Sequence, residues 1–142
     1  IFFRHRRWLT REFPELLAAR PPYHRVLEVG CGVGNTLFPL LEENPHLQFL
    51  SFDISSRAVE LLTSSVEFSK ESCQAFVWDI CTAPPPGDIV VRGSCHHALL
   101  LFVLSAVIPK YHRTALSHMA SCLTVGAHVY FRDYVAGDMA QS

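Results

Sequence analysis

Three glycines at alternate positions stand out in the stretch EVGCGVGN, residues 28–35. Gly30, Gly32 and Gly34 follow an apolar run that ends in Val26-Leu27. A turn with so little side chain lets the backbone come within contact distance of a ligand, and the free amides of a following helix then face that ligand. The stretch therefore predicts a ligand-binding loop, although glycines at strand–helix turns also occur for packing alone.

Two carboxylates follow in places where they could complete such a site. Asp53 ends a second apolar run, nineteen residues after Gly34, and Asp79 ends a third. A carboxylate at the first position can accept both hydroxyls of a ribose, and one at the second can accept the adenine amino group, with Ile80 against the ring. Each aspartate alone could be a helix cap or a loop residue. Three ligand-facing positions at successive strand ends indicate a cofactor that contains adenosine.

The spacing of the glycines separates two classes of cofactor. The dinucleotide fingerprint G-x-G-x-x-G would place its third glycine at position 35, which is Asn35. The observed G-x-G-x-G, with Glu28 two residues before it, is the arrangement seen for S-adenosylmethionine, which has no pyrophosphate. We therefore expect S-adenosylmethionine as the cofactor, and a nicotinamide oxidoreductase is disfavoured.

Short apolar runs alternate with amphipathic segments along the chain. Strands are predicted over residues 26–30, 47–52, 73–78, 98–103 and 128–131, and helices over residues 36–43, 55–66 and 109–125. This alternation predicts an α/β fold with a doubly wound, Rossmann-like parallel sheet, in which ligands bind beyond the carboxyl ends of the strands. The glycine loop and both aspartates would then lie at one edge of the sheet.

The chain begins with a basic and aromatic arm, residues 1–22, ahead of a core at residues 23–142. Residues 1–25 hold six arginines against two glutamates, on a chain whose formal net charge is only −1. A local excess of arginine suggests an anionic partner, with a solvated first helix as the alternative. The bulk charge itself gives no basic field for nucleic acid.

Cysteine usage and hydropathy bear on the compartment. The five cysteines form no C-x-x-C pair, which favours reduced thiols and an intracellular, by default cytoplasmic, protein, with mitochondria and the nucleus left open. The longest apolar run, residues 98–108, is too short to span a bilayer, so no membrane partner is expected. Cys95, His96 and His97 are adjacent in a strand and cannot all face one ion, so no metal is expected either.

Five longer segments carry a family resemblance: FFRHRRWLTREFPEL (2–16), LEVGCGVGNTLFPLLEENP (27–45), FDISSRAVELL (52–62), LLFVLSAVIP (100–109) and FRDYVAGDMAQ (131–141). Together they resemble the methyltransferase-like family that makes 3-methylcytidine in the anticodon loop of transfer RNA. The resemblance implies a class I S-adenosylmethionine-dependent methyltransferase sheet, here expected to lack its last two strands. With the glycine loop included, the expected cofactor-binding residues are Glu28, Gly30, Cys31, Gly32, Gly34, Asp53, Ile54, Asp79, Ile80 and Leu101.

The implied reaction transfers a methyl group to N3 of a cytidine. Cytosine N3 has a lone pair at neutral pH, so no strong general base is needed, but the product ring is positive and a carboxylate could stabilise it. Asp133 is the candidate, with Arg132 fixing the loop or a phosphate; a mutual surface ion pair is the alternative. Arg4, Arg7 and Trp8 are candidates for phosphate contact and base stacking, although Trp8 could equally anchor the arm.

Two departures from the family pattern leave other functions open. His96 stands where the family usually has an aspartate, and LTVGAH (123–128) replaces Leu-Lys-Pro-Gly-Gly. One alternative is a truncated or diverged paralogue without catalysis, and another is a small-molecule methyltransferase with the same loop. The expected partner is the anticodon stem-loop of transfer RNA, and whether an aminoacyl-tRNA synthetase or another helper presents it is left open.

Overall fold

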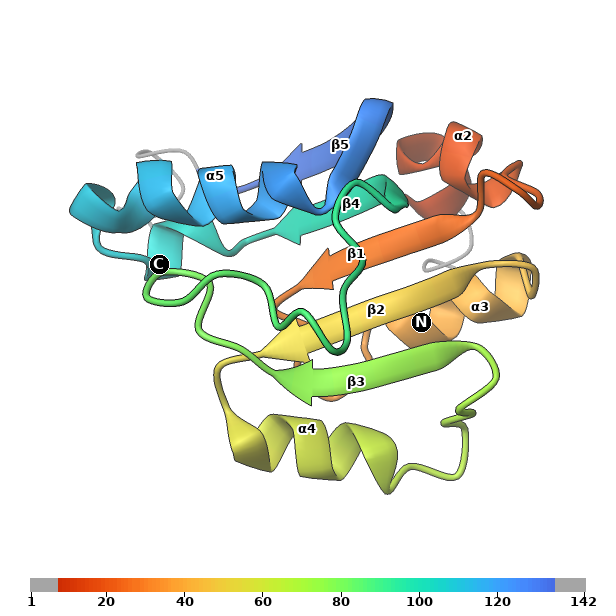
Figure 1. Cartoon of the computed structure of the whole chain (residues 1–142). Coiled ribbons are helices and arrows are strands. Elements are labelled where there is room, and N and C mark those ends of the chain that lie inside the picture. Colours follow the sequence, from red (N-terminus) through yellow and green to blue (C-terminus); the bar gives the residue numbers. More distant parts are fainter. Residues whose placement is uncertain (1–7, 135–142) are drawn as a thin grey trace.

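The strands form one parallel sheet. The computed structural model describes residues 8–134, and its strands run in the order β3-β2-β1-β4-β5 with every pairing parallel. They are β1 (Arg25–Val29), β2 (Gln48–Asp53), β3 (Cys73–Val77), β4 (Cys95–Leu101) and β5 (Leu123–Arg132). Strand order reverses between β1 and β4, and the carboxyl ends meet at one edge of the sheet (Figure 1). The predicted doubly wound α/β sheet is confirmed.

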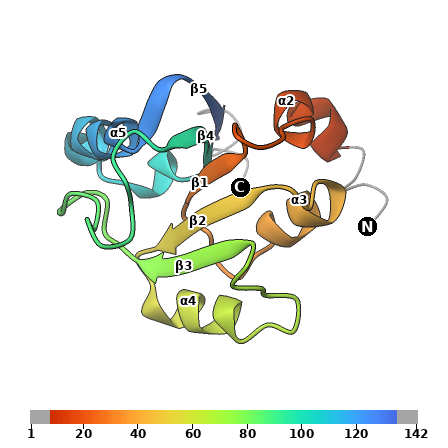
Figure 2. The same cartoon turned by 45° about the vertical axis from the view of Figure 1, so that its right-hand side comes forward.

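Helices cover both faces of this sheet. They include α2 (Pro14–Leu17), α3 (Leu37–Glu43), α4 (Ser56–Thr63) and α5 (His112–Ser121), with 3₁₀ turns η1 (Leu104–Ala106) and η2 (Pro109–Tyr111) before α5; residues 8–12 are helical as well. Figure 2 shows α2 and α3 on one side of the sheet, and α5 with the connection from β3 to β4 on the other. Part of the second face is therefore covered by a loop, residues 78–94, instead of a helix.

The hydrophobic core has one half on each face. The central strand β1 is buried from Val26 to Val29 because both of its faces are covered. On one face Leu16 and Leu37 pack with residues from β1, β2 and α4, and on the other Trp78 and Met119 pack together. Because Leu16 belongs to the first half, the described part of the arm shares the core of the sheet. The arm boundary at residue 22 stays a prediction.

The amino edge of the sheet is fastened to the arm by hydrogen bonds. The side-chain amide nitrogen of buried Asn44 donates to the carbonyls of Leu16 (3.1 Å) and Ala19 (2.9 Å). His97 Nε2 bonds the Tyr23 carbonyl at 3.0 Å, so that nitrogen is the donor. Burial lowers the pKa of His97, which keeps the ring neutral inside the protein. These bonds satisfy groups that would be costly to bury alone.

The fifth strand is longer than the sequence predicted. It begins at Leu123 instead of residue 128, and Gly126 lies inside it with φ +84° instead of ending the helix. A register shift against β4 between Cys95 and His97 accommodates this extra length. A glycine in a strand interior often marks such an irregularity, and here it was mistaken for a helix stop.

The fourth helix is shorter than predicted. The Ser55 hydroxyl accepts a hydrogen bond from the Ala58 amide at 3.1 Å and so caps the helix. The helix ends at Thr63 instead of residue 66, so Val66 lies beyond it and is fully exposed. At the start of α3, Thr36 is the N-cap residue but makes no side-chain cap bond.

Three further expectations concern chemistry and membranes. All five cysteines are free thiols. Within residues 8–134, no group of three His, Cys, Asp or Glu side chains is arranged to hold a metal ion. In the same part of the chain, every helix is too short or too polar to cross a bilayer.

Candidate functional site

A cavity of about 440 Å³, here called the main cavity, opens at the carboxyl edge of the sheet. Its walls come from the ends of β1 to β4, from the loop after β3 and from the segment before α5. Six of the ten predicted cofactor residues line it: Gly30, Asp53, Ile54, Asp79, Ile80 and Leu101. A neighbouring side cavity of about 190 Å³ is lined by Glu28, Gly30, Cys31, Gly32 and Leu101, among others. Only Gly34 of the predicted set lines neither cavity.

The carboxylate of Asp53 is held in place by two backbone amides. Oδ2 accepts from Gly32 at 2.8 Å, which ties the end of β2 to the glycine loop, and Oδ1 accepts from Ser55 at 3.0 Å. A carboxylate has about four acceptor positions, so each oxygen keeps one for a ligand in the main cavity. This is the arrangement needed to accept a pair of ribose hydroxyls.

The segment that follows β3 supplies an apolar wall of the main cavity, formed by Trp78 and Ile80, with the carboxylate of Asp79 beside it. Asp79 Oδ1 accepts from the Cys81 amide at 3.0 Å, which turns the loop. Ile80 is buried after it, and Trp78 Nε1 donates to the Ala83 carbonyl at 2.9 Å. An adenine ring suits such a wall because its face is apolar and its amino group can reach a carboxylate.

Glu28 is a carboxylate buried under the side cavity. It is 4% exposed and accepts a hydrogen bond from the Ser51 hydroxyl at 2.8 Å. Burial is the main reason that the pKa of Glu28 is raised to about 7; the Ser51 hydrogen bond lowers it in part, and the charge of Asp53 adds to the rise. A cation bound nearby would favour the ionised form. The side cavity is therefore suited to a positively charged ligand group.

The glycines of the loop have different reasons to be glycine. Gly32 has φ +54°, and a Cβ there would meet nothing within 4 Å, so its backbone faces open space. Gly34 has φ +98°, and a Cβ would lie 2.4 Å from the Phe38 ring, so this glycine serves close packing of α3. Cys31 precedes Gly32 in the same loop. Burial, and to a smaller extent the charges of Glu28 and Asp53, raise the pKa of its thiol to about 12. Cys31 is thus a small, protonated residue and no nucleophile.

Comparison with known proteins agrees with this geometry. A family model described as a methyltransferase domain matches residues 27–129. The chain belongs to this methyltransferase family. Solved structures support the fold of this methyltransferase domain: a putative S-adenosyl-L-methionine-dependent methyltransferase from Methanococcus maripaludis has a TM-score of 0.66 at 11% identity, over 90% of this chain and 53% of that one. A TehB-like methyltransferase from Corynebacterium glutamicum has a TM-score of 0.64 at 16% identity, over 99% and 77%.

Sequence relatives narrow the comparison. The human tRNA N(3)-cytidine methyltransferase METTL6 is 41% identical over 98% of this chain and 50% of its own length. The yeast (Saccharomyces cerevisiae) tRNA(Thr) (cytosine(32)-N(3))-methyltransferase is 39% identical over 99% of this chain and 23% of its own. The methyltransferase domain described here thus spans half or less of these two relatives. The resemblance found in the five sequence segments is confirmed.

The two predicted catalytic residues lie at the end of β5, outside both cavities of the methyltransferase domain. Arg132 forms an ion pair with Glu12 of the arm, and Asp133 accepts from the backbone amides of Ser105 (3.0 Å) and Tyr134 (2.9 Å). Each residue thus has a partner other than the one that the mutual ion pair would supply. Partial burial alone would raise the pKa of Asp133, but hydrogen bonds from Ser105, Tyr134 and Leu104 outweigh it and lower the pKa. The carboxylate stays ionised.

The predicted substrate residues are only partly described. Arg4 and Arg7 lie outside the described residues. Trp8 is half-buried, with its ring edge-to-face against Phe13 at a centroid distance of 5.3 Å, and Phe13 packs in turn against Tyr130 at 5.4 Å. These contacts match the interpretation of Trp8 as an anchor that holds the arm on β5. Its stacking role stays a prediction.

An exposed aromatic pair beside the main cavity was missed in the sequence. Phe102 lines the cavity and has φ +57°, and its ring lies 4.9 Å from that of Tyr134. They are 45% and 52% exposed. A bulky residue with positive φ is strained, and such strain concentrates at functional sites. Both residues belong to the quoted motifs LLFVLSAVIP and FRDYVAGDMAQ, but their pairing depends on the β4–β5 contact.

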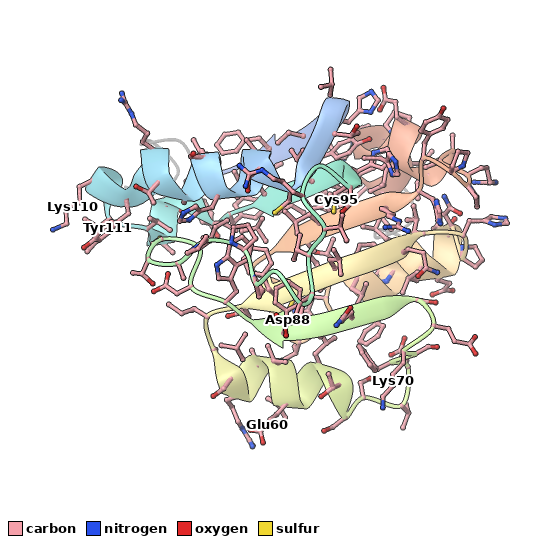
Figure 3. All side chains as sticks on the ribbon, in the orientation of Figure 1. Glu60, Lys70, Asp88, Cys95, Lys110 and Tyr111 are labelled. Carbon is pink, nitrogen blue, oxygen red and sulfur yellow. The ribbon has the colours of Figure 1, made fainter. Side chains whose placement is uncertain are left out.

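One wall of the main cavity was also missed. Val103, Ala106, Val107 and Ile108 come from the segment around η1, and Tyr111 follows at the start of α5. Figure 3 shows Tyr111 beside Lys110 in η2, next to the end of α5 that lies at the carboxyl edge of the sheet. Nothing in the sequence periodicity distinguishes these apolar residues from ordinary core.

The departure at residue 96 lies far from this wall. His96 is near the amino end of β4, where Nδ1 accepts from the Arg25 amide at 3.2 Å and the ring meets Tyr23 edge-to-face. Neither cavity of the methyltransferase domain includes it. The histidine thus lies at the amino edge of the sheet, away from the residues that line these two cavities.

Proposed function

We propose that this chain carries S-adenosylmethionine-dependent methyl transfer to N3 of a cytidine in the anticodon loop of transfer RNA. One observation carries the proposal. The cavities at the carboxyl edge collect nine of the ten cofactor residues expected from the sequence, in a chain whose relatives include tRNA N(3)-cytidine methyltransferases of human and fruit fly at 41% and 38% identity.

The residues at this edge fit the parts of the cofactor in turn. Asp53, with an open acceptor position on each oxygen, suits the ribose hydroxyls, and Asp79 and Ile80 suit the adenine amino group and ring. Glu28, buried beside the side cavity, suits the positively charged end of the cofactor. When bound, S-adenosylmethionine supplies a methyl group already activated by its sulfonium.

The protein then has to bring the cytosine into line and stabilise charge. Cytosine N3 attacks with its own lone pair, so the residues need only position it and exclude water. The ionised Asp133, at the end of β5, is suited to stabilise the positive charge that the methylated ring gains. Its two backbone hydrogen bonds hold the carboxylate without a moving counter-ion.

The aromatic pair is suited to hold the base itself. Enzymes that modify a base in RNA take it out of the stack and place it on aromatic or arginine planes. Phe102 and Tyr134 offer half-exposed rings at the mouth of the main cavity. Arg132, the last residue of β5, is paired with Glu12 and half-exposed, and it is suited to contact a phosphate.

Partners and compartment follow from the same proposal. The anticodon stem-loop is the substrate, with Arg4, Arg7 and Trp8 of the arm as further contacts. An aminoacyl-tRNA synthetase or another helper that presents the transfer RNA belongs to the proposal as well. A transfer RNA substrate places the protein inside the cell, with the cytoplasm as the default compartment.

The cofactor part of the proposal is tested by calorimetric titration with S-adenosylhomocysteine. We expect Asp53→Ala to weaken binding by about 100-fold, because two charge-assisted hydrogen bonds of roughly 1.5 kcal/mol each are lost. The matched control is Asp88→Ala, which removes an exposed carboxylate from the loop that crosses the face of the sheet (Figure 3) and should leave binding unchanged. Equal binding by both variants would contradict the site.

The substrate part is tested by methyl transfer to transfer RNA transcripts. A transcript with cytidine in the anticodon loop should be methylated, and one with uridine there should not, because uridine N3 carries a proton instead of a lone pair. Phe102→Leu and Tyr134→Leu should each lower turnover about tenfold, as loss of one base-stacking contact predicts. Binding of S-adenosylhomocysteine without any RNA methylation would favour the non-catalytic or small-molecule alternative.

A further inference from the structure

Two histidines of α5 form hydrogen bonds to the backbone of two walls of the main cavity. Neither lines the cavity, and neither belongs to the expected site. His118 Nδ1 lies 2.6 Å from the carbonyl oxygen of Ile80, the residue set against the adenine. His112 Nε2 lies 2.9 Å from both the Leu104 and the Val107 carbonyl oxygens, in the segment that forms the opposite wall. Since carbonyls only accept, each of these ring nitrogens carries a hydrogen and donates.

Each histidine donates a hydrogen bond to a backbone segment whose other backbone hydrogen bonds lie mostly within the segment itself. The loop after β3 is closed by bonds from the Thr82 and Ala83 amides to the Asp79 carbonyl. Those bonds are local, and the side chain of Ile80 packs in the core. The His118 ring, 6.4 Å from the Trp78 ring, provides a tie to α5. The backbone of Ile80 is therefore bonded to α5 by a side chain outside the cavity, while its own side chain packs in the core.

The wall formed by residues 103–108 around η1, here called the η1 wall, is also held mainly by hydrogen bonds within its own segment. Ala106 and Val107 donate to Val103 and Leu104 within the segment, which again sets only its local shape. Its side-chain hydrogen bonds to other elements are the forked bond from His112 and the bond from the Ser105 amide to Asp133, and Val103 and Leu104 also pack against the core. A loop with few ties opens more often than the core, because local unfolding follows local contacts.

We propose that His112 and His118 are positioning residues, which set the two walls of the main cavity at the separation the adenosine part of the cofactor requires. The proposal rests on the proposed function, because it takes the main cavity to be the cofactor site. Both histidines sit on one ten-residue helix whose buried face, Ala115 and Met119, packs in the core. One rigid element thus fixes both walls relative to the sheet, and the cavity is preformed when the cofactor arrives.

Amide side chains allow a matched test of each bond. Glutamine can place its NH₂ where Nε2 of histidine lies, and asparagine can place it where Nδ1 lies. The rescuing variants are therefore His112→Gln and His118→Asn, and the swapped variants, His112→Asn and His118→Gln, put the donor in the wrong place. His112→Leu and His118→Leu remove the donor. His46→Leu, at an exposed histidine before β2, is the control.

The first measurement is amide hydrogen exchange of the protein without cofactor. His118→Leu should speed exchange in residues 79–83 and His112→Leu in residues 103–108, while β1 and β2 keep their protection. The rescuing variants should restore slow exchange and the swapped variants should not. Faster exchange throughout the sheet would mean that the histidines only stabilise the fold, and that result overturns the proposal.

The second measurement is the affinity for S-adenosylhomocysteine. Each leucine variant should bind about tenfold more weakly, the effect of one lost hydrogen bond, with the rescuing variants near the parent and His46→Leu unchanged. Parent-like affinity of both leucine variants would overturn the positioning role and leave the cofactor site standing. If instead the parent itself fails to bind while exchange responds as expected, the cofactor assignment fails, and the proposed function and this inference fall together.

Discussion

At the amino edge of the sheet the buried side chains of Asn44 and His97 find their partners inside the protein, whereas at the carboxyl edge two half-buried aspartates keep acceptor positions open toward a cavity. Asn44 makes two donations and accepts from the His46 amide at 3.1 Å, and His97 bonds Tyr23 and Tyr130. Asp53 and Asp79, by contrast, have acceptor capacity left beside the main cavity. One edge stabilises the fold and the other is arranged for binding.

The largest effect on stability should come from the amino edge. Asn44→Leu leaves the Leu16 and Ala19 carbonyls and the His46 amide without their partner, so the free energy of unfolding should fall by about 3 kcal/mol. Chemical denaturation measures this. The affinity of the remaining folded protein for S-adenosylhomocysteine should not change. Gln74→Leu, at an exposed strand position, serves as the control, and an equal loss there would show that the Asn44 bonds are of no special importance.

The next effect comes from Glu28, which reverses the usual pH dependence of a carboxylate. Its pKa of about 7 exceeds the unfolded value, so the folded state holds the proton more firmly and the free energy of unfolding falls as pH rises from about 4.5 to 7. Glu28→Gln removes this slope and should be more stable than the parent above pH 7 by up to about 3 kcal/mol. Parallel stability curves for parent and variant across this range would contradict the assignment.

The smallest effect on stability should come from Phe102. Phe102→Asn relieves part of the strain of a positive φ, because asparagine tolerates that conformation. The relief offsets the lost packing of a half-exposed ring, so the free energy of unfolding should change by less than about 1 kcal/mol. Methyl transfer to RNA should nevertheless fall about tenfold with the stacking surface gone. Lost stability with full activity would place Phe102 among the structural residues.

The sequence predicted the carboxyl edge better than the rest of the molecule for a physical reason. Strand ends are set by local patterns, and in a parallel sheet all carboxyl ends meet, so Asp53, Asp79 and the glycine loop could be placed together from their positions in the chain alone. The length of β5 could not be predicted, because a glycine at position 126 is compatible both with the end of a helix and with an irregularity inside a strand. Only the pairing with β4 decides between these.

The walls of the cavity illustrate a second limit. His112 and His118 act through bonds to carbonyls 5, 8 and 38 residues away, and such bonds leave no spacing rule in the sequence. The Phe102–Tyr134 pair likewise joins two strands. The sequence predicted Asp133 as a catalytic residue because of its charge. In the structure its carboxylate accepts a hydrogen bond from the Ser105 amide and so contacts the η1 wall. Residues that act through the backbone of another segment can be recognised only once the three-dimensional structure is known.

The strand order also governs how the chain reaches this fold. On one side of β1, Val26 pairs with Phe49, and on the other it pairs with His97, far later in the sequence. During synthesis the second side of the central strand has no partner until β4 has left the ribosome. Parallel pairing across such distances forms slowly because a long loop must close first. The apolar edge of β1 is therefore exposed for longest in the growing chain, and early assembly is where this fold is most prone to aggregate.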